Sequence, residues 1–327
     1  MYAYGIWYGI AHMNWMKRLR PRHLSLLISL AESGSLSDTA RQAFMTQPGL
    51  SKWLKDLEED AGAPLFIRLA RGLRPTLEGE LLVRHARRII SEIERAQSNL
   101  DAMLEGNSPN VIIGTSPASA PSLVPDAILY YLNRHPKAQV SLYESTMDVL
   151  LAQLELGVLD VVVGRIDNYR PTQTLHSETL FREPTQIVAR AGHPLLGRTD
   201  LQWPDLYKFD WILWPSSTPI RNRLDAALCN AGLKPLPCRV ESSSLMANLW
   251  LLQNSDMLTV TSGRVAEHFH ARGLVRRLDF ELEAEGSLGM CWRDESHTES
   301  AVLDLLDSLR EAAKSPIRKP SPPSEEK

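Results

Sequence analysis

The stretch TQPGLSKWLKDLEEDAG, residues 46–62, has the pattern of a helix with a defined start. Thr46 is a typical N-cap residue, and Pro48 falls in the first turn, where its missing N–H costs nothing because first-turn amides have no partner inside the helix. Apolar residues recur at spacings of three and four residues and therefore share one face: Leu50, Trp53, Leu54 and Leu57. The segment predicts an amphipathic helix whose opposite face is polar and basic.

Two shorter helices are predicted just before it. Leu24, Leu27, Ile28 and Ala31 mark the first, and GSLSDTARQA (34–43) marks the second, with Ser35 and Asp38 spaced as in a capping box. Three short helices separated by tight breaks, the last exposing amide, hydroxyl and ammonium groups, are typical of a helix-turn-helix.

A basic hairpin is predicted after the third helix. PLFIRLARGLRPT (64–76) contains two short extended runs around Arg71 and Gly72, and Arg68, Arg71 and Arg74 lie within one short stretch. Such a hairpin is a wing that can lie along the phosphates of a duplex.

This region resembles the LysR-type transcriptional regulators. FMTQPGLSKWLKDLEEDAGAPLF (44–66) is similar to their turn, recognition helix and Gly-x-Pro-Leu-Phe break, and Arg68, the Arg71-Gly72 pair, Thr76 and Gly79 match their wing and its exit. Residues 68–76 also resemble the subgroup that regulates a galactose-binding protein. The resemblance implies a winged helix-turn-helix at residues 17–76 that binds double-stranded DNA, with RNA polymerase as a possible further partner.

The charge is distributed unevenly along the 327 residues. The chain is 43% hydrophobic and 23% charged, with a net charge of −3. Residues 17–88 hold 13 Lys and Arg against 8 Asp and Glu, whereas residues 89–327 hold 23 against 31. The basic excess coincides with the predicted helix-turn-helix, as expected for a nucleic-acid-binding surface.

The cysteines indicate a reducing compartment. Cys229, Cys238 and Cys291 are odd in number, lie far apart and have no C-x-x-C spacing, which fits reduced thiols in the cytoplasm. His268 and His270 flank Phe269 without a further ligand nearby, so no metal site and no cofactor are predicted.

No membrane span or signal peptide is predicted. No apolar run approaches the roughly 18 residues that a span needs, and the aromatic N-terminus lacks both a positively charged start and a cleavage site. Because members of the resembled family begin close to the first helix, residues 1–16 are expected to be a disordered or artefactual extension, with translation starting at Met13 or Met16.

A long helix is predicted over residues 77–106, with an apolar seam stepping alternately by four and three residues: Leu82, Ala86, Ile89, Ile93, Ala96, Leu100 and Met103. A two-stranded contact between copies is one use of this seam, and packing on the protein's own core is the other. The resemblance assigns it to a dimerisation linker, in a homodimer or homotetramer.

Residues 111–314 repeat a strand, a polar turn and a helix, which predicts α/β architecture with largely parallel pairing. This half, with LELGVLDVVV and AGHPL, resembles the two-lobed, periplasmic-binding-protein-like (type 2) effector domain of the same regulators. The resemblance places the first lobe at 111–165 and 270–314 and the second at 166–269, with a small-molecule effector between them. The Pro/Ser-rich tail, 315–327, is expected to be disordered. The fold class is therefore α+β multidomain.

Two groups of residues are candidates for DNA contacts. Base readout suits amide, hydroxyl and ammonium groups, with Pro48 available to a thymine methyl; these candidates are Gln47, Pro48, Ser51, Lys52 and Lys55. Phosphate contacts, which position without reading sequence, suit Thr46, Arg68, Arg71 and Arg74, with Arg22 as a further candidate. The alternative is an ordinary solvated helix face.

Effector candidates follow the predicted strands, at turns where helix N-termini favour anions. They are Ser116, Thr146, Arg165, Ser216, Ser217, Thr218 and Ser262. Simple helix capping is the alternative for each Ser and Thr. Arg165 and Arg221 can pair with a ligand carboxylate or bridge to surface acids, and a galactose-type sugar is an alternative to an anionic ligand.

The sequence thus predicts a regulator whose operator binding or promoter activation responds to an effector, and not an enzyme. The alternatives are an enzyme or solute-binding protein on the same scaffold, and an architectural DNA binder without an effector. The sequence contains no G-x-S-x-G elbow, P-loop, H-E-x-x-H or G-x-G-x-x-G motif that would favour an enzyme.

Overall fold

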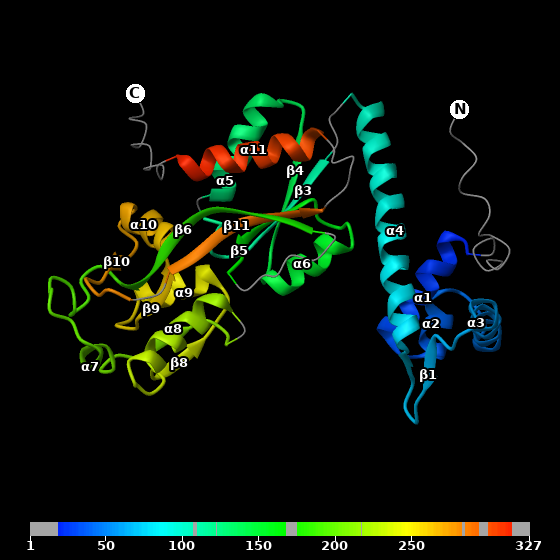
Figure 1. Cartoon of the computed structure of the whole chain (residues 1–327), viewed down its shortest axis with the longest axis horizontal. Helices are drawn as coiled ribbons and strands as arrows, with labels where there is room; N and C mark the ends of the chain where they lie inside the picture. Colours follow the sequence, from blue (N-terminus) through cyan, green and yellow to red (C-terminus); the bar gives the residue numbers. More distant parts are fainter. Residues whose placement is uncertain are drawn as a thin grey trace. The chain divides into compact units, whose positions relative to one another are not determined.

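The computed structural model describes residues 19–106, 110–121, 123–167, 175–216, 218–282, 285–293 and 300–315 (Figure 1). The chain divides into two compact units, residues 1–100 and 101–327. The predicted extension, 1–16, and all of the predicted tail except Ser315 lie outside the described residues.

The N-terminal unit is a winged helix-turn-helix. It contains α1 (Pro21–Ser33), α2 (Leu36–Gln42), α3 (Gln47–Ala61), an antiparallel pair made of β1 (Phe66–Arg68) and β2 (Leu73–Pro75), and the long α4 (Leu77–Leu104). Its core joins leucines from α1 and α3 to the start of the wing.

The helix starts follow the predicted caps. The Thr46 hydroxyl accepts a hydrogen bond of 3.2 Å from the Gly49 amide at the start of α3, and Ser35 accepts one of 3.2 Å from the Asp38 amide at the start of α2. The Asp38 carboxylate pairs with Arg41 at 2.7 Å, so the described residues form half of the predicted capping box, the bond to the Ser35 hydroxyl. The second and third helices therefore start where a side-chain hydroxyl satisfies one of their first amides.

Backbone amides at the wing donate hydrogen bonds to the helices and to the turn after α1. The Glu58 carboxylate of α3 accepts bonds from the Leu65 and Phe66 amides, at 2.8 and 3.0 Å. On the other strand, the Leu73 amide donates to the Gly34 carbonyl at 2.7 Å. Gly72 has φ of 88°, and a Cβ there would lie 2.4 Å from the same carbonyl oxygen. The wing can therefore approach the helices only with glycine at its tip.

The long helix α4 begins against the wing and then becomes exposed. Its Gly79 packs so tightly that a Cβ would lie 1.9 Å from the Leu65 carbonyl oxygen. Of the predicted seam, Leu82 packs on the core of the unit and Ala86 is buried, whereas Ile89 and Ile93 are 47% and 44% exposed. Packing on the protein's own core thus accounts for the first two seam positions and leaves the rest uncovered.

The C-terminal unit is built on a mixed sheet with the order β10-β6-β11-β5-β3-β4, and β9 also pairs with β6. The strands are β3 (Asn110–Thr115), β4 (Gln139–Glu144), β5 (Val161–Arg165), β6 (Leu175–Ala189), β9 (Thr259–Ser262), β10 (Arg276–Arg277) and β11 (Glu285–Arg293). The prediction of largely parallel pairing is wrong for this sheet. Only β3 pairs in parallel, with β4 and β5, because β6 and β11 run antiparallel to their neighbours.

The first lobe places helices on both faces of the sheet. Val161 and Val163 pack with α5 (Leu123–Arg134) and α11 (Ser300–Lys314), whereas Val162 packs with α6 (Met147–Glu155) on the opposite face (Figure 1). Alternate strand residues point to opposite faces. A continuous valine run is therefore the sequence of a strand covered on both sides.

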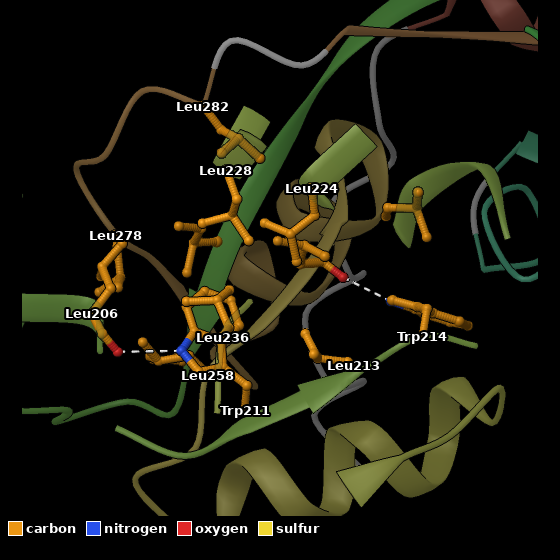
Figure 2. Close-up of a cluster of buried hydrophobic side chains, with 14 of the residues drawn as sticks. Leu206, Trp211, Leu213, Trp214, Leu224, Leu228, Leu236, Leu258, Leu278 and Leu282 are labelled. Carbon is orange, nitrogen blue, oxygen red and sulfur yellow. Dashed lines mark hydrogen bonds between the residues drawn. The ribbon is translucent and has the colours of Figure 1, made fainter. Parts of the chain in front are cut away.

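The second lobe has a separate core. It contains α7 (Trp203–Leu206), β7 (Trp211–Leu213), α8 (Pro219–Asn230), β8 (Cys238–Glu241), α9 (Leu245–Gln253) and α10 (Gly263–Ala271). Figure 2 shows two indole rings that form hydrogen bonds within this core. Trp211 Nε1 donates to the Leu206 carbonyl at 3.2 Å, and Trp214 Nε1 donates to the Val260 carbonyl at 2.8 Å. Both polar N–H groups are therefore satisfied inside an apolar cluster.

The packing moves both limits of the predicted lobes. Leu180 in β6 packs in the first lobe, but Ile187 in the same strand packs in the second. Val275, Leu278 and Leu282 belong to second-lobe clusters. The crossovers thus lie within β6 and beyond Leu282, and not at 165/166 and 269/270, because one 15-residue strand serves both lobes.

Replacing Gly79 with Ala should destabilise the N-terminal unit by about 1–3 kcal/mol, the usual cost of overpacking, because the new methyl group meets a backbone carbonyl that cannot rotate away. Urea denaturation monitored by hydrogen exchange in peptides from residues 21–76 measures the loss. Glu78→Ala, an exposed change one residue away, should leave the stability unchanged; equal effects of the two changes would contradict the packing argument.

Candidate functional site

The outward face of α3 carries the side chains predicted to read bases. Gln47, Pro48, Lys52 and Lys55 are exposed, and Ser51 is half-buried. Lys55 lies 3.4 Å from Glu59, but both side chains are more than 60% exposed, so the pair holds Lys55 weakly. Most of this face is therefore available to a partner.

The wing extends this face. Arg68, Arg71 and Arg74 are exposed, and Arg68 Nη2 donates a hydrogen bond of 3.0 Å to the Ser51 hydroxyl. Sequence reasoning missed this bond because the two residues lie 17 positions apart. An open groove of about 420 Å³ lies between α3 and the wing, and Pro48, Ser51, Lys52, Lys55 and Arg68 contribute to its lining.

A strained, exposed aromatic residue precedes α3. Phe44 has φ of 54°, and its side chain is 99% exposed. A non-glycine residue in the left-handed region costs roughly 1–2 kcal/mol, and such strain is found more often at functional sites than elsewhere. Sequence patterns gave no signal for it, since nothing in a Phe indicates a positive φ.

The second candidate site is a cavity of about 390 Å³ between the lobes. Five of the seven predicted effector residues line it: Ser116, Thr146, Arg165, Thr218 and Ser262. Ser216 is not among the described lining residues, and Ser217 lies outside the described residues. Residues from the ends of five strands, β3, β4, β5, β7 and β9, therefore meet at one place, as expected where strands lead into helices in α/β lobes.

Most of the remaining lining is apolar and was not predicted. Trp214, Met147, Leu151 and Ile220 line the cavity, and Ser243 and Thr261 add two hydroxyls. Polar turns gave a signal in the sequence, whereas an apolar residue looks the same whether it faces a core or a cavity.

The helix N-termini at the cavity differ in how they are capped. Ser262 caps α10 by accepting from the Val265 amide at 3.4 Å. Thr146 and Thr218 occupy the N-cap positions of α6 and α8 without a capping bond from their side chains to the described backbone. The Thr218 hydroxyl instead donates to the Pro215 carbonyl at 2.7 Å, and the Thr146 hydroxyl bonds to the Asp148 carboxylate and lowers the pKa of that acid. Capping alone thus explains Ser262 but not the two threonines.

Glycine at position 164 keeps the cavity wall in place. A Cβ there would lie 2.3 Å from the Met147 sulfur and 2.7 Å from the Ser116 hydroxyl oxygen. Both side chains line the cavity, so a larger residue in β5 would displace them.

The two candidate arginines have different surroundings. Arg221 is engaged, since its Nε lies 2.9 Å from both carboxylate oxygens of Asp225. Arg165 is 5% exposed, and its Nη2 lies 3.8 Å from Glu183 Oε1. Burial lowers the pKa of Arg165 and raises the pKa of Glu183. Only Arg165 lines the cavity.

Comparison with known proteins gives two family matches. The family described as "Bacterial regulatory helix-turn-helix protein, lysR family" matches residues 21–80, and the "LysR substrate binding domain" matches residues 105–314. The chain belongs to the LysR family. It is a DNA-binding transcriptional regulator with an effector-binding domain, and not an enzyme.

Relatives span nearly the whole chain. The HTH-type transcriptional regulator GbpR of Azospirillum brasilense is 33% identical over 94% of this chain and 91% of its own length. The HTH-type transcriptional regulator GalR of Pseudomonas putida is 33% identical over 93% of this chain and 76% of its own. The crystal structure of CbnR, a LysR family transcriptional regulator, covers 91% of this chain and all of its own, with a TM-score of 0.63 at 18% identity. The predicted family and fold class are confirmed.

Within the described ranges, none of the helices combines the length and apolar character that crossing a membrane requires.

Replacing Phe44 with Asn should stabilise the N-terminal unit by about 1 kcal/mol, because Asn tolerates the left-handed conformation better than Phe. Urea denaturation monitored by hydrogen exchange in residues 21–76 measures the gain. Phe44→Leu retains the strain and should bring no gain; equal stabilisation by Leu and Asn would show that the backbone conformation is not the cause.

Proposed function

We propose that α3 reads base edges in a duplex major groove while the wing holds the phosphates beside it. The observation that carries this proposal is the hydrogen bond from Arg68 to Ser51, which joins the wing to the polar face of α3. Gln47 and Lys52 stand exposed on that face, and such groups suit adenine and guanine edges. Arg71 and Arg74 extend from the wing and contact phosphate, with Thr46 at the start of α3.

The protein acts in the cytoplasm, where it meets DNA. The interlobe cavity is the proposed effector site. The volume of this cavity falls within the range of roughly 300–1,000 Å³ that is typical of small-molecule sites. An effector changes DNA binding only if it binds one arrangement of the lobes better than another. Residues from both lobes line the cavity, which gives the ligand different contacts when the lobes move.

The exposed part of α4 is the proposed contact between two copies of the chain. Ile89, Ile93, Leu100 and Met103 are 44–67% exposed and follow the heptad spacing. A dimer presents two recognition helices to two half-sites, as a helix-turn-helix protein commonly does. Further association of dimers into a tetramer is compatible with this contact.

Arg71→Ala should weaken binding to operator and random DNA alike and lower the salt slope by about 1, because a phosphate contact releases counterions without reading sequence. Gln47→Ala should instead cost about 1–3 kcal/mol at one base pair and relax the choice there. Gel-shift titrations over a salt series, on DNA from upstream of the gene and on its single-base variants, measure both effects.

Arg239→Ala and Gln253→Ala are matched controls, since both residues are exposed and lie outside the N-terminal unit that the proposal assigns to DNA binding. Equal losses on operator and random DNA for Gln47→Ala and Arg71→Ala would overturn the division of roles.

Ile93→Lys should raise the dimer dissociation constant roughly 10–100-fold, because each dimer would bury two unpaired charges in an apolar seam. Sedimentation velocity over a concentration series measures this change. Ser98 is exposed on the opposite side of α4, and Ser98→Lys should leave the dimer intact; dissociation by both variants, or by neither, would contradict the proposed seam.

A further inference from the structure

The cavity wall includes the guanidinium group of Arg165, which has no hydrogen-bond partner among the described residues. We propose that the effector is an organic acid whose carboxylate binds Arg165 and whose apolar body lies against Trp214, Met147 and Leu151. This inference rests on the proposed effector site and adds the chemical class of the ligand.

The side chain of Arg165 is buried and makes no hydrogen bond within the part of the chain that the structure describes. Arg165 is the last residue of β5 and is 5% exposed, and none of its Nε, Nη1 and Nη2 atoms has a partner among the described residues. A buried donor without an acceptor destabilises the folded protein, and a charged donor does so more strongly. An arginine presents five N–H donors in a fixed fork, so a ligand with two oxygens in one plane would satisfy several of them at once.

Glu183 does not serve as that partner. Its Oε1 lies 3.8 Å from Arg165 Nη2, beyond the 2.7–3.2 Å of a hydrogen bond, and this oxygen is itself unbonded within the described chain. Its Oε2 accepts the Arg264 backbone amide at 2.8 Å. Burial raises the pKa of Glu183, whereas the Arg264 amide and Arg165 lower it, so the two side chains interact by charge but leave the N–H donors of Arg165 free for a ligand.

The other neighbouring carboxylate is already engaged. Asp167 forms an ion pair with Arg223 and accepts a hydrogen bond from the Ser287 amide. Gly286 in β11 makes room for both arginines, since a Cβ there would lie 2.0 Å from Arg165 Nη1 and 1.8 Å from Arg223 Nη1. The guanidinium of Arg165 is therefore held in place by packing and not by an acceptor, which is preorganisation for an incoming one.

The helix N-termini around the cavity also favour an anion. α6 and α8 begin at its wall, and the side chains of Thr146 and Thr218 do not cap them within the described structure. The N-terminus of a helix carries a partial positive charge. At α6, the negative charge of Asp148 reduces this attraction for an anion. Asp148 lines the cavity, is exposed and bonds to the first amides of that helix. This places the ligand's carboxylate at Arg165 and away from α6.

The remaining lining sets the character of the rest of the ligand. Trp214, Met147, Leu151 and Ile220 present aromatic, thioether and aliphatic surface, while Ser116 and Ser243 present hydroxyls. The Ser116 hydroxyl has one long contact, 3.5 Å to Ser119, and can bond to a ligand. A neutral sugar would match the hydroxyls but would bring no carboxylate to the N–H donors of Arg165.

The experiment compares matched acids and neutral analogues by thermal unfolding of the full chain. The pairs are benzoate with benzamide, and D-galacturonate with D-galactose, each over a millimolar concentration series. Benzoate should raise the Tm in a saturable way, as a ligand of the folded state does. Benzoate should bind roughly tenfold or more tightly than benzamide, which is the gain expected from a charge-assisted bidentate bond. Galacturonate should likewise bind more tightly than galactose.

Arg165→Gln should bring the ratio of benzoate to benzamide affinity close to one, whereas Arg165→Lys, which keeps the charge but loses the fork, should retain part of it. Arg221→Gln is the matched control and should keep the wild-type ratio. Far-UV circular dichroism checks that each variant is folded. The comparison of each acid with its neutral analogue on the wild-type protein tests the proposal even if a variant does not fold. The proposal is overturned if benzoate has no effect, if a neutral member matches its acid, or if the preference survives in Arg165→Gln.

Gel shifts with the same compounds separate this inference from the proposed function. Neutral compounds that raise the Tm and change operator binding would contradict the acid class while supporting the effector site. Acids that need Arg165 for binding but never change operator binding would support the acid class and contradict the coupling to DNA.

Discussion

One strand connects both lobes of the effector domain. β6 pairs with β11 over its first ten residues, Leu175–Pro184, and its last five residues, Thr185–Ala189, pair with β9 and β10. Its early residues pack in the core of the first lobe and its late residues in the core of the second. The two lobes therefore have separate cores that share one strand. The cavity lies where the two lobes meet.

This arrangement explains why polar groups collect at the cavity. The turns after β3, β4, β5 and β9 end at the wall, and helices α6, α8 and α10 begin there. Backbone donors at helix starts, hydroxyl groups and one guanidinium thus converge without being adjacent in sequence. The glycines at 164 and 286 let these groups stand close to the strands. A ligand then contacts parts of both lobes and can bias their relative arrangement.

The sequence predicted the features that depend on residues close together in the chain. Thr46 and Ser35 cap helices, and two short strands pair on either side of Arg71 and Gly72. Features that depend on pairing between distant segments were missed. The bond from Arg68 to Ser51, the antiparallel course of β6 and β11, and the place of Trp214 in the cavity wall all require segments far apart in the chain. The conformation of Phe44 has no sequence signal at all.

The contact between Gly34 and Gly72 has a consequence for how this domain can evolve. The turn after α1 and the tip of the wing meet through one carbonyl group, which accepts the Leu73 amide and leaves no space for a Cβ at position 72. A substitution at either glycine would lift the hairpin and tilt its arginines away from the recognition helix. Sequence drift is therefore restricted at these two sites together, whereas Leu69 and Ala70, which are exposed, can vary and alter how the hairpin tip meets a duplex.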